Sequence, residues 1–274
     1  MRFSNRIVNL MIVLSGCQMG IAQTPNTTMT LDVAPREISV HEPVYIALEV
    51  RNGGSSDLHL DLGANKEANF IVFVTDPNGR TTGPLRESSE GLSQIGKVTV
   101  SPSDTFRSKM LLSKLYPFME EGAYSVEVRL DSSAFDASES SLAKQATSKV
   151  TLTVLPRSPQ KLQKMAQELS EEAIQANSYV TRLQAISALA YMRDPVAVPY
   201  LKRVLQEGQQ IQIEAAQGLA RIENPEAIDA LVAAETTTTN TELRGQLKII
   251  LRDLLNKVQE SDTRAKIAAA LQRS

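Results

Sequence analysis

The sequence predicts two domains in series, an antiparallel β-sandwich followed by a short α-helical repeat domain. Two patterns support this prediction. In residues 29–156, short runs of alternating apolar and polar side chains are separated by Gly, Pro, Asn and Asp, which is typical of strands and turns. In residues 157–274 the apolar side chains follow the period of a helix, and one segment recurs 30 positions later. The 274 residues suffice for two hydrophobic cores.

The first half should contain several short strands joined by turns. Its runs rich in Val, Ile, Leu, Tyr and Thr are residues 30–35, 44–52, 57–62, 69–75, 96–100, 105–113, 124–130 and 148–155. Between two of them, Asp76-Pro77-Asn78-Gly79 should form a tight turn, because proline presets φ and glycine accepts a positive φ. Two longer polar stretches, residues 80–95 and 131–148, should be loops.

The segment EEGAYSVEVRL, which contains Tyr124, resembles the penultimate strand of immunoglobulin-like and fibronectin-like domains. This resemblance covers about residues 27–156. It implies that Tyr124 stands at the corner between the two sheets and that its hydroxyl bonds to upstream backbone. The alternative is a half-buried tyrosine of an ordinary strand.

The second half should open with an amphipathic helix at residues 160–176 and continue with a repeated unit. Residues 182–205 align with residues 212–235 at a constant offset of 30, with seven matching apolar or proline positions. Each unit is therefore expected to be a helix, a tight turn and a second helix.

The turn inside each unit carries its own signal. Asp194 and Asn224 are good N-caps, and each precedes a proline, which is favoured at the first helical position. A third unit at residues 241–271 lacks this Asx-Pro turn, as terminal repeats often do. The polar stretch ETTTTN before it should be a connector in which Thr239 and Glu242 form a capping box; the alternative is a binding loop.

These units resemble HEAT-like repeats, particularly the short repeats of phycobilisome lyase-type proteins. The first unit matches the consensus of that family at Ala185, Ala188, Leu189, Met192, Asp194, Pro195, Ala197, Val198, Pro199 and Leu201. The second unit departs from it at Gly218 and Asp229. The resemblance covers residues 180–272 and implies a short α-solenoid; it extends to the scaffold and not to pigment attachment.

The N-terminus has the layout of a secretory signal peptide. Residues 1–6 are basic, residues 7–14 are apolar, and small residues follow. Leu14-Ser15-Gly16-Cys17 resembles the bacterial lipobox, which implies cleavage after residue 16 and lipid attachment to Cys17. The alternative is ordinary cleavage after Ala22, which would release a soluble secreted or periplasmic protein.

On the lipobox interpretation, residues 17–28 form a tether between the membrane and the sandwich. The protein would then be bacterial, extracytoplasmic and held to the membrane by its acyl chains. Cys17 is the single cysteine of the chain, so a disulfide within the monomer is excluded.

Charge and motif content narrow the possible functions. Residues 18–156 carry 12 basic and 17 acidic side chains, and residues 157–274 carry 15 and 14; neither half has the basic surplus of a nucleic-acid-binding protein. No familiar catalytic or cofactor motif occurs, so we expect no enzymatic activity and no cofactor. His41 is expected to be a turn residue. Asp57, His59 and Asp61 should share one face of a strand, either as weak metal ligands or, preferably, as the charged face of an edge strand.

We therefore expect a non-catalytic scaffold that binds a protein or a cell-surface polymer through its sandwich and its repeats. The inner helices of such repeats usually line a groove, and the candidates on them are Tyr200, Lys202, Arg203, Glu226 and Asp229. The alternative is an accessory or inhibitor protein that docks on an extracytoplasmic hydrolase through residues 80–95 or 131–148.

Overall fold

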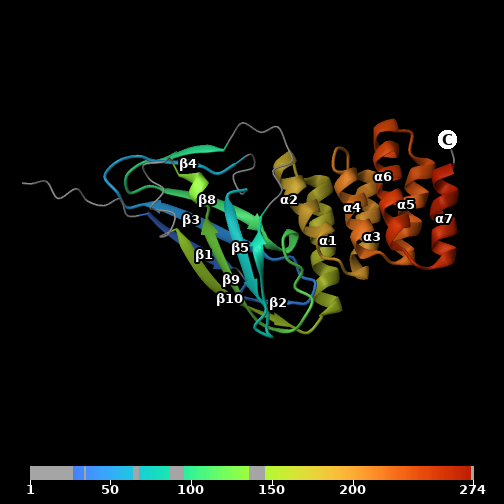
Figure 1. Cartoon of the computed structure of the whole chain (residues 1–274). Helices are drawn as coiled ribbons and strands as arrows, with labels where there is room; N and C mark the ends of the chain where they lie inside the picture. The colour runs from blue at the N-terminus through green and yellow to red at the C-terminus, as the bar shows by residue number, and fades with distance from the viewer. Residues whose placement is uncertain (1–26, 34, 64–67, 87–95, 136–145, 273–274) are drawn as a thin grey trace, which may run out of the picture.

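The computed structural model describes residues 27–33, 35–63, 68–86, 96–135 and 146–272. The predicted leader, Cys17 and most of the predicted tether lie outside these residues. Ten strands between Thr27 and Leu155 are followed by seven α-helices between Pro159 and Gln272, and the helices extend from one end of the sandwich (Figure 1). The order of β then α agrees with the prediction. Among the described residues, none of the helices is long and apolar enough to cross a membrane.

One layer of the sandwich is a five-stranded sheet in the order β2-β10-β9-β5-β6. Its strands are β2 (Glu37–Ser39), β5 (Phe70–Thr75), β6 (Thr81–Leu85), β9 (Gly122–Leu130) and β10 (Thr147–Leu155). All neighbours are antiparallel except β2, which runs parallel to β10. The second layer is the sheet β1-β3-β8, and β4 pairs with β7 in a separate ribbon. These strands are β1 (Thr27–Val33), β3 (Tyr45–Asn52), β4 (Leu58–Asp61), β7 (Lys97–Val100) and β8 (Thr105–Leu111).

The core of the sandwich comes from the period-two pattern. In β3, Ile46, Leu48 and Val50 are buried while their neighbours are partly or fully exposed, because successive side chains of a strand point to opposite faces. Buried side chains of β5, β9 and β10 complete the same core. The two sheets therefore pack face to face in an immunoglobulin-like sandwich.

Tyr124 occupies the predicted corner. Its side chain is buried, and its hydroxyl donates a hydrogen bond of 3.0 Å to the backbone oxygen of Glu120. The rings of Tyr116 and Phe118 contact it edge to face. The tight turn is also confirmed, because the N–H of Gly79 bonds to the oxygen of Asp76 at 3.0 Å and Gly79 has a φ of 80°.

Two strands were not predicted. Strand β6 lies in residues 80–95, which we expected to be a loop, and it pairs with β5 at the edge of its sheet. Its sequence, TTGPL, has no apolar alternation, and proline and glycine are tolerated at such an edge. Strand β2 has only three residues. The remainder of this predicted loop from residue 87, and residues 136–145 of the other loop, lie outside the described residues.

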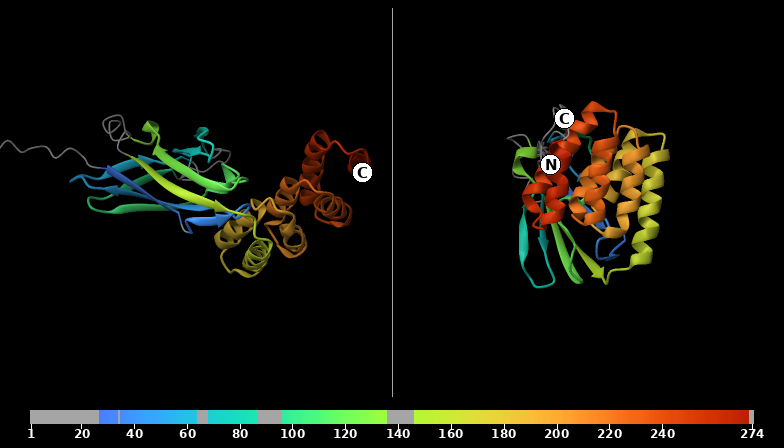
Figure 2. Two further views of the ribbon diagram at one scale, coloured as in Figure 1. Left: turned by 90° about the horizontal axis from the view of Figure 1, so that it is seen from below. Right: turned by 90° about the vertical axis from the view of Figure 1, so that its right-hand side faces the viewer.

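The seven helices form two layers. The helices are α1 (Pro159–Gln175), α2 (Tyr179–Ala190), α3 (Val198–Glu207), α4 (Gln212–Ile222), α5 (Pro225–Thr237), α6 (Thr241–Lys257) and α7 (Ser261–Gln272). Helices α2, α4 and α6 pack in one layer, while α3, α5 and α7 pack in the other. Figure 2 shows these helices stacked one after another along the chain. The predicted helix and three repeat units are thus confirmed.

The second repeat unit departs from the repeat consensus at Gly218, and packing explains the glycine. A Cβ atom at this position would lie 2.8 Å from the Cα of Ala190 and 2.9 Å from the Cδ2 of Leu201. Helix α4 therefore approaches α2 so closely that a side chain would collide with backbone. The next turn differs from the prediction: the side chain of Asn240, not Thr239, caps α6 by accepting bonds from the N–H groups of Glu242 and Leu243.

Candidate interaction surface

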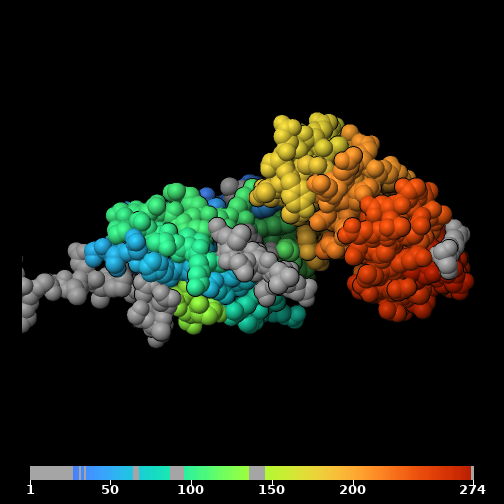
Figure 3. All heavy atoms as spheres, turned by 90° about the horizontal axis from the view of Figure 1, so that it is seen from above, coloured from blue at the N-terminus to red at the C-terminus, as the bar shows by residue number. Residues whose placement is uncertain are grey.

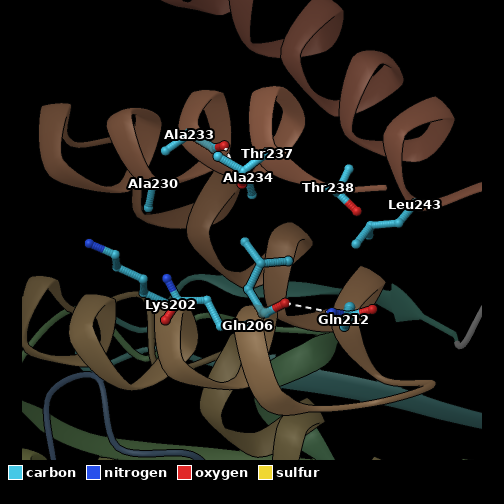
Figure 4. A pocket seen from close by; sticks show the side chains of 10 residues that line it. Lys202, Gln206, Gln212, Ala230, Ala233, Ala234, Thr237, Thr238 and Leu243 are labelled. Atoms are coloured by element: carbon cyan, nitrogen blue, oxygen red, sulfur yellow. Dashed lines mark hydrogen bonds between the residues drawn. The ribbon is translucent and has the colours of Figure 1, made fainter. Parts of the chain in front are cut away.

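A groove of about 390 Å³ opens on the layer formed by α3 and α5. It lies between the C-terminal halves of these two helices and the first residues of α4 and α6. Ten residues line it: Lys202, Leu205, Gln206, Gln212, Ala230, Ala233, Ala234, Thr237, Thr238 and Leu243. Figure 4 shows these side chains around the opening, with the α3 residues facing those of α5.

Helix composition accounts for the groove. Helix α3 buries Leu201, Val204 and Leu205. It lines the groove with the exposed Lys202 and Gln206 and with the edge of Leu205. On the facing side of α5 stand alanines, whose methyl groups leave space that larger side chains would fill. The groove is therefore a consequence of small residues at the contact between two second helices.

Polar groups stand around the alanine surface. The Gln212 amide nitrogen donates to the backbone oxygen of Leu205 at 2.7 Å, which fixes the start of α4 against the end of α3 (Figure 4). The hydroxyl of Thr237 donates to the oxygen of Ala233 at 2.9 Å. Lys202 is exposed and is the one charged side chain among the lining residues. The groove thus offers amides, hydroxyls and a single ammonium group.

The five predicted surface residues do not form one site. Only Lys202 lines the groove. Tyr200 is half-buried against the helical core, and Arg203 pairs with Glu207 at 3.3 Å. Glu226 and Asp229 are exposed on α5, where Asp229 forms an ion pair with Lys266 of α7.

Sequence reasoning missed most of the groove. Gln206, Gln212 and the threonines at the end of α5 line it together with the alanines. The stretch ETTTTN, for which a binding loop was one alternative, supplies Thr237 and Thr238; the other available signal was the excess of alanine on one face of α5. Neither signal specified a groove without knowledge of how α3 and α5 pack.

The ribbon of β4 and β7 places the other candidate group. His59 and Asp61 project from the exposed face of β4, opposite the buried Leu58 and Leu60, as the alternation predicts. The Nδ1 atom of His59 lies 3.2 Å from the hydroxyl of Thr99. Within the described part of the chain, His, Cys, Asp and Glu do not gather in a group of three that could hold a metal ion.

Comparison with known proteins finds a similarity within the helical half. The family model for HEAT repeats matches residues 166–252. No curated protein matches the chain. Among solved structures, a CARDB domain from Pyrococcus furiosus in complex with di-metal ions is similar at 12% identity, with a TM-score of 0.29 and coverage of 48% of this chain and 90% of that one.

Two further structures are similar over about half of the chain. The yjhA protein from Bacillus subtilis has 14% identity and a TM-score of 0.26, with 48% of this chain and 93% of that one covered. A β-glucosidase from Listeria innocua has 13% identity and a TM-score of 0.27, with 47% of this chain and 16% of that enzyme covered. The family model for HEAT repeats thus covers the chain from within α1 to within α6, and the strands that precede it form an immunoglobulin-like sandwich.

Proposed function

We propose that this protein is a non-catalytic, exported bacterial lipoprotein that binds a protein partner through its HEAT repeats. HEAT repeats and an immunoglobulin-like domain are consistent with a protein-interaction scaffold. The observation that carries the proposal is the groove between α3 and α5, because its volume of about 390 Å³ is open, partly apolar and lined by unreactive side chains.

The chemistry of the groove favours an extended polypeptide segment. The alanines of α5 leave room for small side chains, and the amides of Gln206 and Gln212 can bond to a passing backbone. The ammonium group of Lys202 favours a segment that carries an acidic side chain. One such contact at an exposed site contributes about 1 kcal/mol or less, so shape and backbone bonds must supply the rest.

Photocrosslinking in cell envelopes tests the groove. A photoreactive amino acid at position 233 should capture one partner protein, whereas the same group at the exposed Ala265 of α7 should not. Lys202→Glu and Ala233→Phe should each reduce recovery of that partner at least tenfold, while Arg252→Glu and Ala265→Phe leave it unchanged. Recovery that is insensitive to both groove variants would contradict the proposal.

Two other results would identify a different mode of binding. A hydrolase that is captured equally by the groove variants and the parent protein would indicate an accessory or inhibitor that docks through its sandwich. A polysaccharide recovered in place of a protein would indicate a polymer-binding scaffold.

The lipoprotein part of the proposal rests on the leader sequence. Cys17→Ser removes the thiol that would accept the lipid while hardly altering the apolar run, so the variant should lose acyl labelling and leave the membrane fraction or remain uncleaved. Ala22→Arg should have no effect, because that position matters only for the rival cleavage. The reverse pattern, with a soluble wild-type protein beginning near Gln23, would show that the chain is not lipidated.

A further inference from the structure

The contact between the sandwich and the HEAT repeats contains two buried carboxylates, one on each side. Glu42, in the turn after β2, is 4% exposed and accepts bonds from the N–H of Ser39 at 2.9 Å and from Lys161 of α1 at 2.6 Å. Nearby, the hydroxyl of Tyr45 donates to the backbone oxygen of Gln184 in α2 at 3.1 Å. Figure 3 shows the sandwich and the first helices in direct contact.

The second carboxylate is Asp194, in the turn between α2 and α3. It is fully buried, and Arg157 of the interdomain connection donates hydrogen bonds to both of its oxygens at 2.6 and 2.8 Å. The N–H of Val196 also donates to it at 2.9 Å. Bonds of this charge-assisted, bidentate kind are among the strongest in proteins. Asp194 is thus already neutralised by Arg157 of the connection between the domains.

His41 reaches this ion pair from the sandwich. Its Nε2 atom lies 4.0 Å from Oδ2 of Asp194, and its side chain is 15% exposed. Its Nδ1 atom is buried and has no hydrogen-bond partner among the described residues. The backbone of His41 has a φ of 71°, a left-handed conformation that holds the ring toward the helices.

The charges around the ring favour its neutral form. The groups that act on it are Asp194, Arg157 and Arg193, so the cluster without His41 already carries one net positive charge. Burial lowers the pKa of His41 below 6.5, the two arginines lower it further, and Asp194 opposes them; the net shift is downward. A proton on this ring adds a second positive charge in a partly buried site, where Arg157 already holds the available carboxylate.

Apolar packing at the contact is incomplete. A cavity of about 210 Å³ lies between the domains, lined on the sandwich side by Ile38 and Val44 and on the helical side by Met165 and Leu169. Atoms that border a void lack neighbours on one side and gain less from the contact. The polar contacts of Glu42 and Tyr45 and the approach of His41 to Asp194 add to this attachment.

We propose that His41 is a proton-sensitive latch between the sandwich and the HEAT repeats: the neutral ring packs against the Arg157–Asp194 pair and keeps the domains together, and the protonated ring releases them. The sign follows from linkage. Since the folded chain binds this proton more weakly than the unfolded chain, the contribution of His41 to the contact is fully present above about pH 6.5 and decreases as the pH falls below that value. This inference is independent of the groove.

Calorimetry of the mature protein tests the latch. At about pH 7.5 the domains should unfold in a single transition, and at about pH 5 the wild type should show two, because the sandwich and the repeats then unfold separately. His41→Asn removes the titrating ring but tolerates the left-handed backbone. Because it also removes the ring that packs between the domains, its unfolding profile should no longer differ between the two pH values. The control His59→Asn, which changes the second of the two histidines in the chain, should behave as the wild type.

Each other outcome overturns the proposal. One transition in the wild type at pH 5, or two at pH 7.5, would show that protonation does not govern the contact. One transition in His41→Asn at pH 7.5 and two at pH 5 would show that groups other than His41 titrate. Histidine NMR supplies a readout that does not depend on the variants: the ring of His41 should titrate at a lower pH in the folded protein than in the protein unfolded by urea.

Discussion

The turns of the first two HEAT repeats begin with the same backbone conformation but have different surroundings. Arg193 and Glu223 stand at equivalent positions and both are left-handed, with φ of 53° and 55°. The next residues, Asp194 and Asn224, are both extended and both cap a following turn through their side-chain oxygens. A proline follows each of them.

The two turns differ in the side chain of the capping residue and in its surroundings. The carboxylate of Asp194 is fully buried, binds Arg157 and faces His41 of the sandwich. The amide of Asn224 is partly exposed, and the bond it accepts comes from the N–H of Ala227 at 2.8 Å. The comparison teaches that the cap alone suffices to build a repeat. A negative charge at the same position converts this turn into a docking point for a neighbouring domain.

The largest effect should come from Asp194→Ala. It removes a cap worth about 1 kcal/mol and charge-assisted hydrogen bonds worth about 1.5–3 kcal/mol; because Arg157 is partly exposed and can be resolvated, we expect a loss of about 2–4 kcal/mol. Urea unfolding measures it. A loss below about 1 kcal/mol would mean that the two turns are energetically equivalent despite their surroundings.

The same position predicts an acid dependence. Burial alone would raise the pKa of Asp194, but hydrogen bonds from Arg157 and the N–H of Val196 bring it below 3.8. Its contribution is therefore present above about pH 4 and lost as the pH falls further. Asp194→Asn should retain part of the capping interaction. Its free energy of unfolding should fall less than that of the wild type as the pH drops below about 4.

A medium effect should come from Gly218→Ala, which gives the second repeat the residue found at the equivalent Ala188 of the first. The new methyl group would press on the backbone of Ala190, so we expect a loss of about 1–3 kcal/mol. The reciprocal change, Ala188→Gly, creates no collision and should cost only about 1 kcal/mol through helix propensity and lost packing. If alanine at 218 were stabilising, the close approach of α4 to α2 would be wrong.

The smallest effect should come from the cap of the second repeat. Asn224→Ala should cost about 1 kcal/mol, the value of a cap alone. The free energy of unfolding of Asn224→Asp should stay within about 0.5 kcal/mol of the wild-type value, since both residues cap well. In the described structure no neighbouring domain contacts this side chain. An effect of Asn224→Ala as large as that of Asp194→Ala would remove the distinction between the two turns.

The sequence predicted the strands and helices correctly where the hydrophobic period and the flanking turn or cap residues agreed. The alternation YIALEVRN gave β3, the Asx-Pro turns gave the repeat boundaries, and the Gly-x-Tyr pattern placed Tyr124 at its corner. They failed for β2 and β6, which are too short or too polar to show a period and are held by pairing with distant strands. They also misplaced the cap of α6, where three consecutive candidates compete and only the geometry selects Asn240.

The sites depended on contacts that no local pattern contains. His41 looked like an ordinary turn residue, and that description is correct for its backbone; its contact with Asp194, far along the chain, arises only from the docking of two domains. Lys202 was one of five surface candidates of equal standing, and the packing of α3 on α5 separates it from the others. Side chains such as Ala230 contribute to the groove only because their small size leaves space between α3 and α5.

The connection between the domains has a mechanical consequence. Strand β10 ends at Leu155 and α1 begins at Pro159, so only three residues join a central strand pair to the first helix. Thr27 lies at the other end of β1, about 20 Å from the residues that meet the helices. If the chain is anchored before Thr27 and a partner pulls on the repeats, tension runs along the strands and loads their hydrogen bonds together rather than one by one. The sandwich would then transmit the pulling force between membrane and partner without unfolding.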